Sequence, residues 1–102
     1  MSDSQLQKIE GISNQIFDVL KDESRLAIFF LLLANGELTL KQMSDTLEKG
    51  KTTIHHHIRK LENLKLVFWE EREDDRKKLK TRYYSLNYDY LQNIFSLEVE
   101  KK

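Results

Sequence analysis

The 102-residue sequence contains no cysteine and no proline, and only three of its residues are glycine. Without cysteine the chain forms no disulfide, no thiolate metal site and no cysteine nucleophile. It also lacks a low-complexity tract, an internal repeat and a recognisable linker, so we expect a single domain over residues 1–102. The longest apolar run, residues 26–34, is too short to cross a bilayer, and no secretory signal is present, so we expect a cytoplasmic location and no membrane partner.

Features of catalysis are missing as well. The sequence has no glycine-rich phosphate loop and no nucleophile in a recognisable local motif. Three consecutive histidines, His55 to His57, invite a metal interpretation, but successive helical side chains point about 100° apart and cannot converge on one ion. We therefore predict that the protein is not an enzyme and holds neither a metal nor a cofactor.

Charge is balanced overall but unevenly distributed. The 17 basic and 17 acidic side chains give a formal net charge of zero, which by itself argues against nucleic-acid binding. Residues 40–66 nevertheless hold six basic and three acidic side chains, and residues 76–82 hold five basic and no acidic ones. Because phosphates respond to local potential, these two segments predict a DNA-binding face. Residues 70–75 are mostly acidic, and pairing with the basic run across a hairpin would neutralise part of it.

Apolar residues at helical spacing predict two helices in the first third of the chain. Residues 6–20 carry one apolar face. Residues 23–34 are apolar nearly all round, which is typical of a central buried helix. Asp22 is a suitable N-cap for this second helix, and Gly36 can adopt the left-handed conformation that ends it.

Two shorter helices and a hairpin follow. Thr39 and Gln42 have capping-box spacing at the start of a third helix, and a fourth begins near Thr52, which we expect to cap it. Residues 67–69 and 82–86 are rich in β-branched and aromatic side chains and predict two strands joined by a charged excursion. A last helix follows Asn87, which can cap it. The fold class is thus mainly α (α+β), with about five helices and a two-stranded hairpin.

A short capped helix, a tight turn with glycine and a longer helix with a polar face form the helix-turn-helix pattern, and the hairpin adds a wing. The second helix of such a pair enters the major groove with its N-terminal residues at base edges. The candidate DNA contacts on this recognition helix are Lys51, Thr52, Thr53, His55, His56, Arg59 and Lys60. The candidate phosphate or minor-groove contacts on the wing are Arg76, Lys77, Lys78 and Lys80. The interpretation requires both sets to lie on one side of the molecule.

Some residues near these candidates have simpler explanations. His57 faces the domain's own wall on a helical wheel, so we expect it to be buried and hydrogen-bonded. His55 and His56 are alternatively solvated surface residues. Trp69, Tyr83 and Tyr84 are expected to pack in the core or the hairpin and not to stack on bases. The role of Arg82 stays open.

Four stretches in order resemble the ArsR-type winged helix-turn-helix regulators of prokaryotes, over about residues 15–90. Residues 22–26 are similar to the family's D-P-T-R-L, residues 40–47 to its L-x-x-[IL]-A-x-x-L, residues 52–61 to its S-x-V-S-x-H-L-x-x-L, and residues 82–86 contain its Y-Y-x-L. Glu23 replaces the usual proline. The cysteine pair of the third helix and the Asp/His ligands of the last helix are missing, so the resemblance implies a regulator without the metal-sensor site.

The resemblance also implies dimerisation through the first and last helices, which independently hold surplus apolar side chains. The residues predicted for the dimer interface are Leu6, Ile9, Ile16, Leu91, Ile94, Phe95 and Val99. We therefore predict a sequence-specific double-stranded DNA-binding regulator that binds a pseudo-palindromic operator as a homodimer, with repression as the commoner family role. A small-molecule effector between the first and last helices is compatible with this function. The alternative is a winged-helix protein–protein interaction module without DNA binding, which the zero net charge supports.

Overall fold

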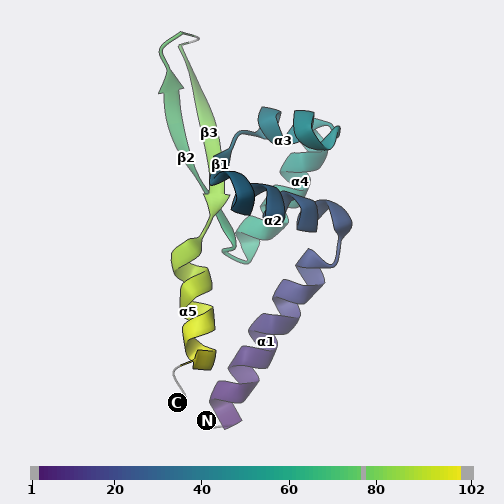
Figure 1. Ribbon diagram of the computed structural model, residues 1–102, viewed down its shortest axis with the longest axis vertical. Helices are drawn as coiled ribbons and strands as arrows, with labels where there is room; N and C mark the ends of the chain where they lie inside the picture. The colour runs from purple at the N-terminus through teal and green to yellow at the C-terminus, as the bar shows by residue number, and fades with distance from the viewer. Residues whose placement is uncertain (1–2, 77, 100–102) are drawn as a thin grey trace.

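The computed structural model describes residues 3–76 and 78–99. Five helices and three strands form within this part of the chain (Figure 1). The elements are, in order, α1 (Asp3–Leu20), α2 (Glu23–Asn35), β1 (Glu37–Leu38), α3 (Leu40–Leu47), α4 (Lys51–Asn63), β2 (Val67–Asp74), β3 (Leu79–Leu86) and α5 (Tyr88–Val99). The predicted winged helix-turn-helix fold is confirmed, with α3 and α4 as the helix pair and β2 and β3 as the wing.

Helix boundaries follow local capping chemistry. The Asp22 carboxylate accepts a hydrogen bond from the Arg25 amide at 3.0 Å, so Asp22 is the predicted N-cap of α2. Gly36 ends the same helix at φ 85°, a conformation that glycine adopts without steric cost. At the start of α3, Thr39 and Gln42 form both hydrogen bonds of the predicted capping box.

The start of α4 differs from the prediction. Thr52 does not cap this helix: α4 begins at Lys51, its N-cap is Gly50, and no side chain hydrogen-bonds to the cap. The preceding helix, α3, ends at Leu47, because Glu48 takes the left-handed conformation at φ 54°. The turn between the two helices therefore closes before Gly50, and Gly50 is left in the extended conformation of an N-cap.

The strands of the wing are longer than the segments predicted for them, residues 67–69 and 82–86. They belong to a three-stranded antiparallel sheet in the order β1-β3-β2. The register places Trp69 opposite Tyr84 and Glu73 opposite Lys80. Residues 70–74 and 79–81, which lie between the two predicted strands, thus continue the ladder. The third strand, β1, has only two residues and pairs with β3 at Leu38 and Tyr84; the sequence analysis did not predict it.

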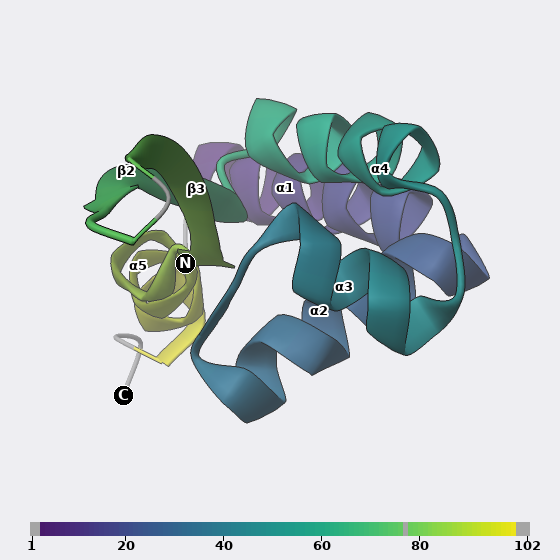
Figure 2. The ribbon, with the colours of Figure 1, turned by 90° about the horizontal axis from the view of Figure 1, so that it is seen from above.

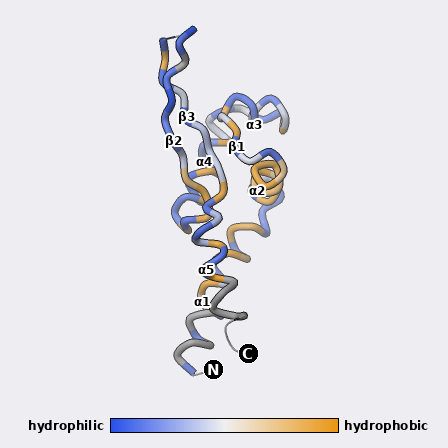
Figure 3. Tube along the Cα trace, turned by 60° about the vertical axis from the view of Figure 1, so that its left-hand side comes forward, coloured by the Kyte–Doolittle hydropathy of each residue, from blue (hydrophilic) through white to orange (hydrophobic). Residues whose placement is uncertain are grey.

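The core lies between α2, α3, α4 and the base of the sheet. Its fully buried or nearly fully buried residues are Ile28, Leu32, Met43, Ile54, Ile58, Leu61, Leu66, Val67, Tyr84 and Leu86. The prediction that α2 is the central buried helix is only half correct. Ile28 and Leu32 are buried, but Phe30 is 56% and Leu33 is 49% exposed, and Leu26 lies on the same side of the helix. The strongly apolar character of α2 is visible in Figure 3.

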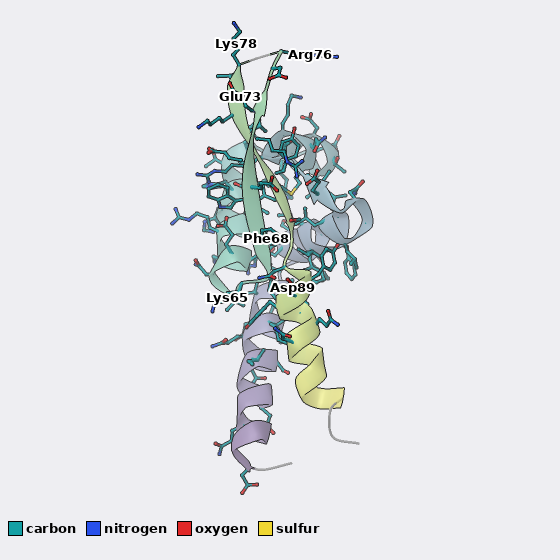
Figure 4. All side chains as sticks on the ribbon, turned by 90° about the vertical axis from the view of Figure 1, so that its left-hand side faces the viewer. Lys65, Phe68, Glu73, Arg76, Lys78 and Asp89 are labelled. Atoms are coloured by element: carbon teal, nitrogen blue, oxygen red, sulfur yellow. The ribbon has the colours of Figure 1, made fainter. Side chains whose placement is uncertain are left out.

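The molecule is elongated, with extents of 54 × 26 × 20 Å. The wing tip stands at one end of the long axis, and α1 and α5 run side by side toward the other (Figures 1 and 4). No helix in the described part of the chain is long and apolar enough to span a membrane.

Candidate nucleic-acid interface

The polar face of α4 is open to solvent because its apolar face supplies the core. Ile54, Ile58 and Leu61 are fully buried, and they hold the helix against the domain. The predicted recognition residues lie away from this face. Lys51, Thr52, Thr53, His56, Arg59 and Lys60 are exposed, and His55 is half-buried.

The start of α4 and the inner part of the wing border the same surface groove. One hollow is lined by Leu40, Lys51, Thr52, His55, Arg82 and Tyr84. An adjoining hollow is lined by Thr39, Leu40, Lys41, Lys51, Leu79, Lys80, Thr81, Arg82 and Tyr83. The structure thus brings four predicted contacts, Lys51, Thr52, His55 and Lys80, to one groove. Figure 2, seen from the wing end, shows the wing, α3 and α4 around this end of the molecule.

The remaining predicted contacts lie around this groove and not in it. Arg76 and Lys78 stand at the tip of the wing (Figure 4). Lys77 lies outside the described residues. Thr53, His56, Arg59 and Lys60 continue along the exposed face of α4. A surface that touches both the groove and the wing tip must therefore extend beyond the groove on two sides, as a nucleic-acid duplex does.

Arg82 is a groove residue whose role the sequence analysis left open. Its guanidinium carbon lies 3.9 Å from the centroid of the Trp69 ring, in cation–π geometry. Trp69 and Arg82 come from neighbouring strands, and Trp69 pairs with Tyr84, two residues along β3 from Arg82. The aromatic ring therefore holds a positive charge at the rim of both hollows. Alternation along β3 could have indicated this position, because Lys80, Arg82 and Tyr84 share one face.

A second arginine fixes the wing to the rest of the sheet. The Arg72 guanidinium donates two hydrogen bonds to the Glu37 carboxylate, at 2.7 and 2.8 Å, and two longer ones to the Glu70 carboxylate, both at 3.4 Å. It also lies 4.6 Å from the centroid of the Tyr83 ring. These hydrogen bonds hold the pKa of Glu37 below its usual value and raise the pKa of Arg72. The wing is thereby tied to β1.

His57 is half-buried and not fully buried as predicted, but it is hydrogen-bonded and connects α4 with α2. Its Nδ1 lies 3.3 Å from Nη1 of Arg25. Because an arginine can only donate, Nδ1 accepts, and the neutral imidazole carries its proton on Nε2. Arg25 also donates from Nε to the Val19 carbonyl at 2.7 Å. Burial lowers the pKa of His57, an effect that the nearby Asp22 partly opposes.

An apolar hollow lies where α1 and α5 meet α2 and the base of β2, near the middle of the long axis (Figure 1). It is lined by Ser13, Ile16, Phe17, Leu20, Phe29, Leu66, Leu91 and Ile94. Three of the predicted dimer residues, Ile16, Leu91 and Ile94, therefore share one surface. Leu6, Ile9, Phe95 and Val99 belong to the same two helices, but their side chains lie outside the described part of the structure. Phe17, which was not predicted for the interface, also lines this hollow and is 67% exposed.

The chain matches one family model and is similar to several transcriptional regulators. A family model described as the TFIIE alpha subunit matches residues 11–102. The HTH-type transcriptional regulator YceK of Bacillus subtilis is 37% identical over 87 residues, which cover 84% of this chain and 81% of YceK. The cadmium resistance transcriptional regulatory protein CadC homolog of Staphylococcus aureus is 30% identical over 80 residues, which cover 78% of this chain and 61% of that protein. Reduced HlyU from Vibrio cholerae shares the fold, with a TM-score of 0.69 at 24% identity over 94% of this chain and 95% of HlyU.

Together, the capped helix pair, the wing and these relatives define a class: the chain is a winged helix-turn-helix transcriptional regulator. The chain also belongs to the family described as the TFIIE alpha subunit, whose model matches residues 11–102. Because the relatives are regulators, the prediction that the protein is not an enzyme is confirmed.

Proposed function

We propose that this regulator binds double-stranded DNA sequence-specifically as a homodimer and acts as a repressor. The observation that carries the proposal is the shared groove, where Lys51 at the start of α4 faces the basic flank of the wing at Lys80 and Arg82. A recognition helix in the major groove would leave the wing beside the adjacent phosphates. Base edges would then be read from the exposed face of α4, at His55, His56, Arg59 and Lys60, with Thr52 and Thr53 allowing close approach.

The proposed dimeric state rests on the apolar hollow of α1 and α5, whose lining residues are all different from those of the groove. Ile16, Phe17, Leu91 and Ile94 expose apolar surface there that a second copy would cover. Two-fold symmetry would place two recognition helices about 34–36 Å apart, in successive major grooves of a pseudo-palindrome. The same hollow is where a small-molecule effector would act. We assign the chain more narrowly to the ArsR-type regulators on the four motifs and on its similarity to the CadC homolog.

Selection of bound duplexes from a random pool tests the proposal. The purified chain is expected to enrich a pseudo-palindromic site, and sedimentation of the complex is expected to show two protomers per duplex. Repression is then measured with a reporter that carries the selected site in its promoter. Enrichment of a site without symmetry would contradict the homodimer, and failure to retard any duplex at low salt would contradict DNA binding itself.

One observation favours a second candidate, a protein–protein interaction module. Phe30 and Leu33 on α2 are about half exposed and lie, with Leu26, on a stripe that no described element covers. Exposed apolar stripes of this kind mark sites of protein contact. The retardation experiment separates the candidates, because an interaction module without DNA binding leaves every duplex unretarded.

A further inference from the structure

The hollow at the start of α4 has a cationic rim and two further features that suit an anion. It lies between the first turns of α3 and α4 and the base of the wing, and it is lined by Leu40, Lys51, Thr52, His55, Arg82 and Tyr84. Among these described lining residues none is acidic. Two of them, Lys51 and Arg82, are cationic, and Arg82 is held at its place by the Trp69 ring.

The first feature is the helix start itself. A 13-residue helix presents unpaired amides and a partial positive charge at its N-terminus. At α3 the Thr39 side chain takes up one of these amides, but Gly50 has no side chain to do the same at α4. The amides of the first turn of α4 are thus left for an external acceptor, and a phosphate is the common one at such a position.

The second, independent feature is the hydroxyl of Tyr84. The side chain is 0% exposed, and its Oη has no hydrogen-bond partner among the described residues. A buried hydroxyl without a partner destabilises the fold, and a phenylalanine would fill the same space without that cost. Tyr84 lines the hollow together with the first turn of α4, so its side chain lies beside the position of an anion bound there.

We propose that this hollow binds one phosphate group of the DNA backbone and that Tyr84 Oη donates a hydrogen bond to it. The assignment rests on the proposed DNA-binding function and adds a residue and a contact to it. The amides of α4 and the charges of Lys51 and Arg82 bind the same phosphate. Because Tyr84 Oη is closed to water in the free chain, a rim side chain would have to move aside on binding, and the long side chain of Lys51 is the one that we expect to move. A phosphate held between helix and wing sets how α4 lies in the major groove.

The test compares the full-length chain with Tyr84→Phe, Lys51→Gln and, as a matched control, Tyr90→Phe, which removes a tyrosine hydroxyl from α5 far from the groove. Thermal unfolding comes first, and Tyr84→Phe is expected to be at least as stable as the parent. Binding to a duplex retarded by the parent is then measured over a series of salt concentrations. Tyr84→Phe is expected to bind about tenfold more weakly at every salt concentration, because it loses a hydrogen bond to a charged group.

The salt dependence separates the two kinds of contact. Lys51→Gln is expected to reduce the slope of log affinity against log salt by about 0.9, because one phosphate contact is lost, whereas Tyr84→Phe leaves the slope unchanged. Tyr90→Phe is expected to match the parent. Parental affinity in Tyr84→Phe, or an equal loss in Tyr90→Phe, overturns the proposal.

A parent chain that binds no duplex contradicts the proposed function but still leaves the anion site testable. In that case inorganic phosphate is titrated at constant ionic strength, with backbone amide resonances of the first turn of α4 as the readout. Shifts that saturate in the parent and are weakened in Tyr84→Phe support a phosphate site of another function. Equal shifts in both proteins, or none, overturn it.

Discussion

Arg72 and Glu37 form a bidentate ion pair, with Nη1 2.7 Å from Oε1 and Nη2 2.8 Å from Oε2. The two residues come from β2 and β1, which are not neighbours in the sheet, because β3 lies between them. The pair therefore spans β3 and joins the two outer strands. Both side chains are exposed, so we expect it to orient the wing more than to stabilise the fold.

Replacement of Arg72 by glutamine is expected to loosen the wing. Amide hydrogen exchange along β2 and β3 should accelerate, while the melting temperature falls by only a few degrees. Hydrogen bonds from Arg72 depress the pKa of Glu37, so the contribution of the pair is present above pH 4.5 and is lost as the pH falls through the pKa of the folded state. Lys21→Gln, which breaks the exposed pair with Asp18 on α1, is the control and should leave exchange in the wing unchanged.

His57 is expected to make stability pH-dependent. Burial lowers its pKa below 6.5, so the unfolded chain binds a proton more readily than the folded one. Stability from this residue is present above pH 6.5 and declines as the pH falls toward the pKa of the folded state. Urea unfolding between pH 5 and 8 should show a smaller pH dependence in His57→Gln than in the parent chain. Identical profiles would show that His57 does not titrate differently on folding.

Arg59→Ala and His56→Ala are expected to relax sequence preference. Both side chains are exposed on α4, and their removal should cost a factor of about 10 to 100 against the preferred base at one position of each half-site. The measurement is duplex selection with each variant beside the parent. An unaltered selected sequence in both variants would place base recognition elsewhere on α4.

Lys78→Gln and Lys80→Gln are expected to weaken binding to all sequences alike. Each should reduce the salt slope by about 0.9 if its side chain meets one phosphate. Lys49→Gln, a basic-to-neutral change in the turn before α4, serves as the comparison for general charge loss. Should the wing variants keep the parental slope, the wing lies away from the phosphates.

Phe17→Glu is expected to produce a monomer. Phe17 is 67% exposed at the apolar hollow, so the change places a charge in the proposed interface without opening the core. Phe30→Glu is the matched control, because Phe30 is similarly exposed but lies on α2 away from that hollow. Sedimentation should show a monomer for Phe17→Glu and a dimer for Phe30→Glu. The reverse pattern would move the interface to α2.

The elements that could be predicted from the sequence are those whose ends are set by a local capping side chain or by a glycine. Asp22, Thr39 and Gly36 act on amides or dihedrals within a few residues, so their spacing was sufficient. β1 could not be predicted because two residues have no periodicity, and only pairing with β3 makes them a strand. The exposed side of α2 was missed for a related reason: an apolar residue is equally apolar whether or not a neighbour covers it.

For the candidate site, the sequence indicated which side chains of α4 face outward but not what faces them. The groove forms because β3 returns past the start of α4, and this is a tertiary contact without a local pattern. Tyr84 was assigned to packing, and it is indeed fully buried. The missing partner of its hydroxyl could not be predicted, because it depends on which side chains of other elements surround the ring.

The elongated shape has a mechanical consequence. If two copies are joined at α1 and α5, the wing tip of each protomer lies at the far end of a molecule that is 54 Å long. A rotation of one degree about the dimer junction then displaces the wing tip by up to about 1 Å. Small changes in how the helices pack at the junction would therefore change the spacing of the two DNA-binding surfaces, which must match the fixed pitch of the double helix.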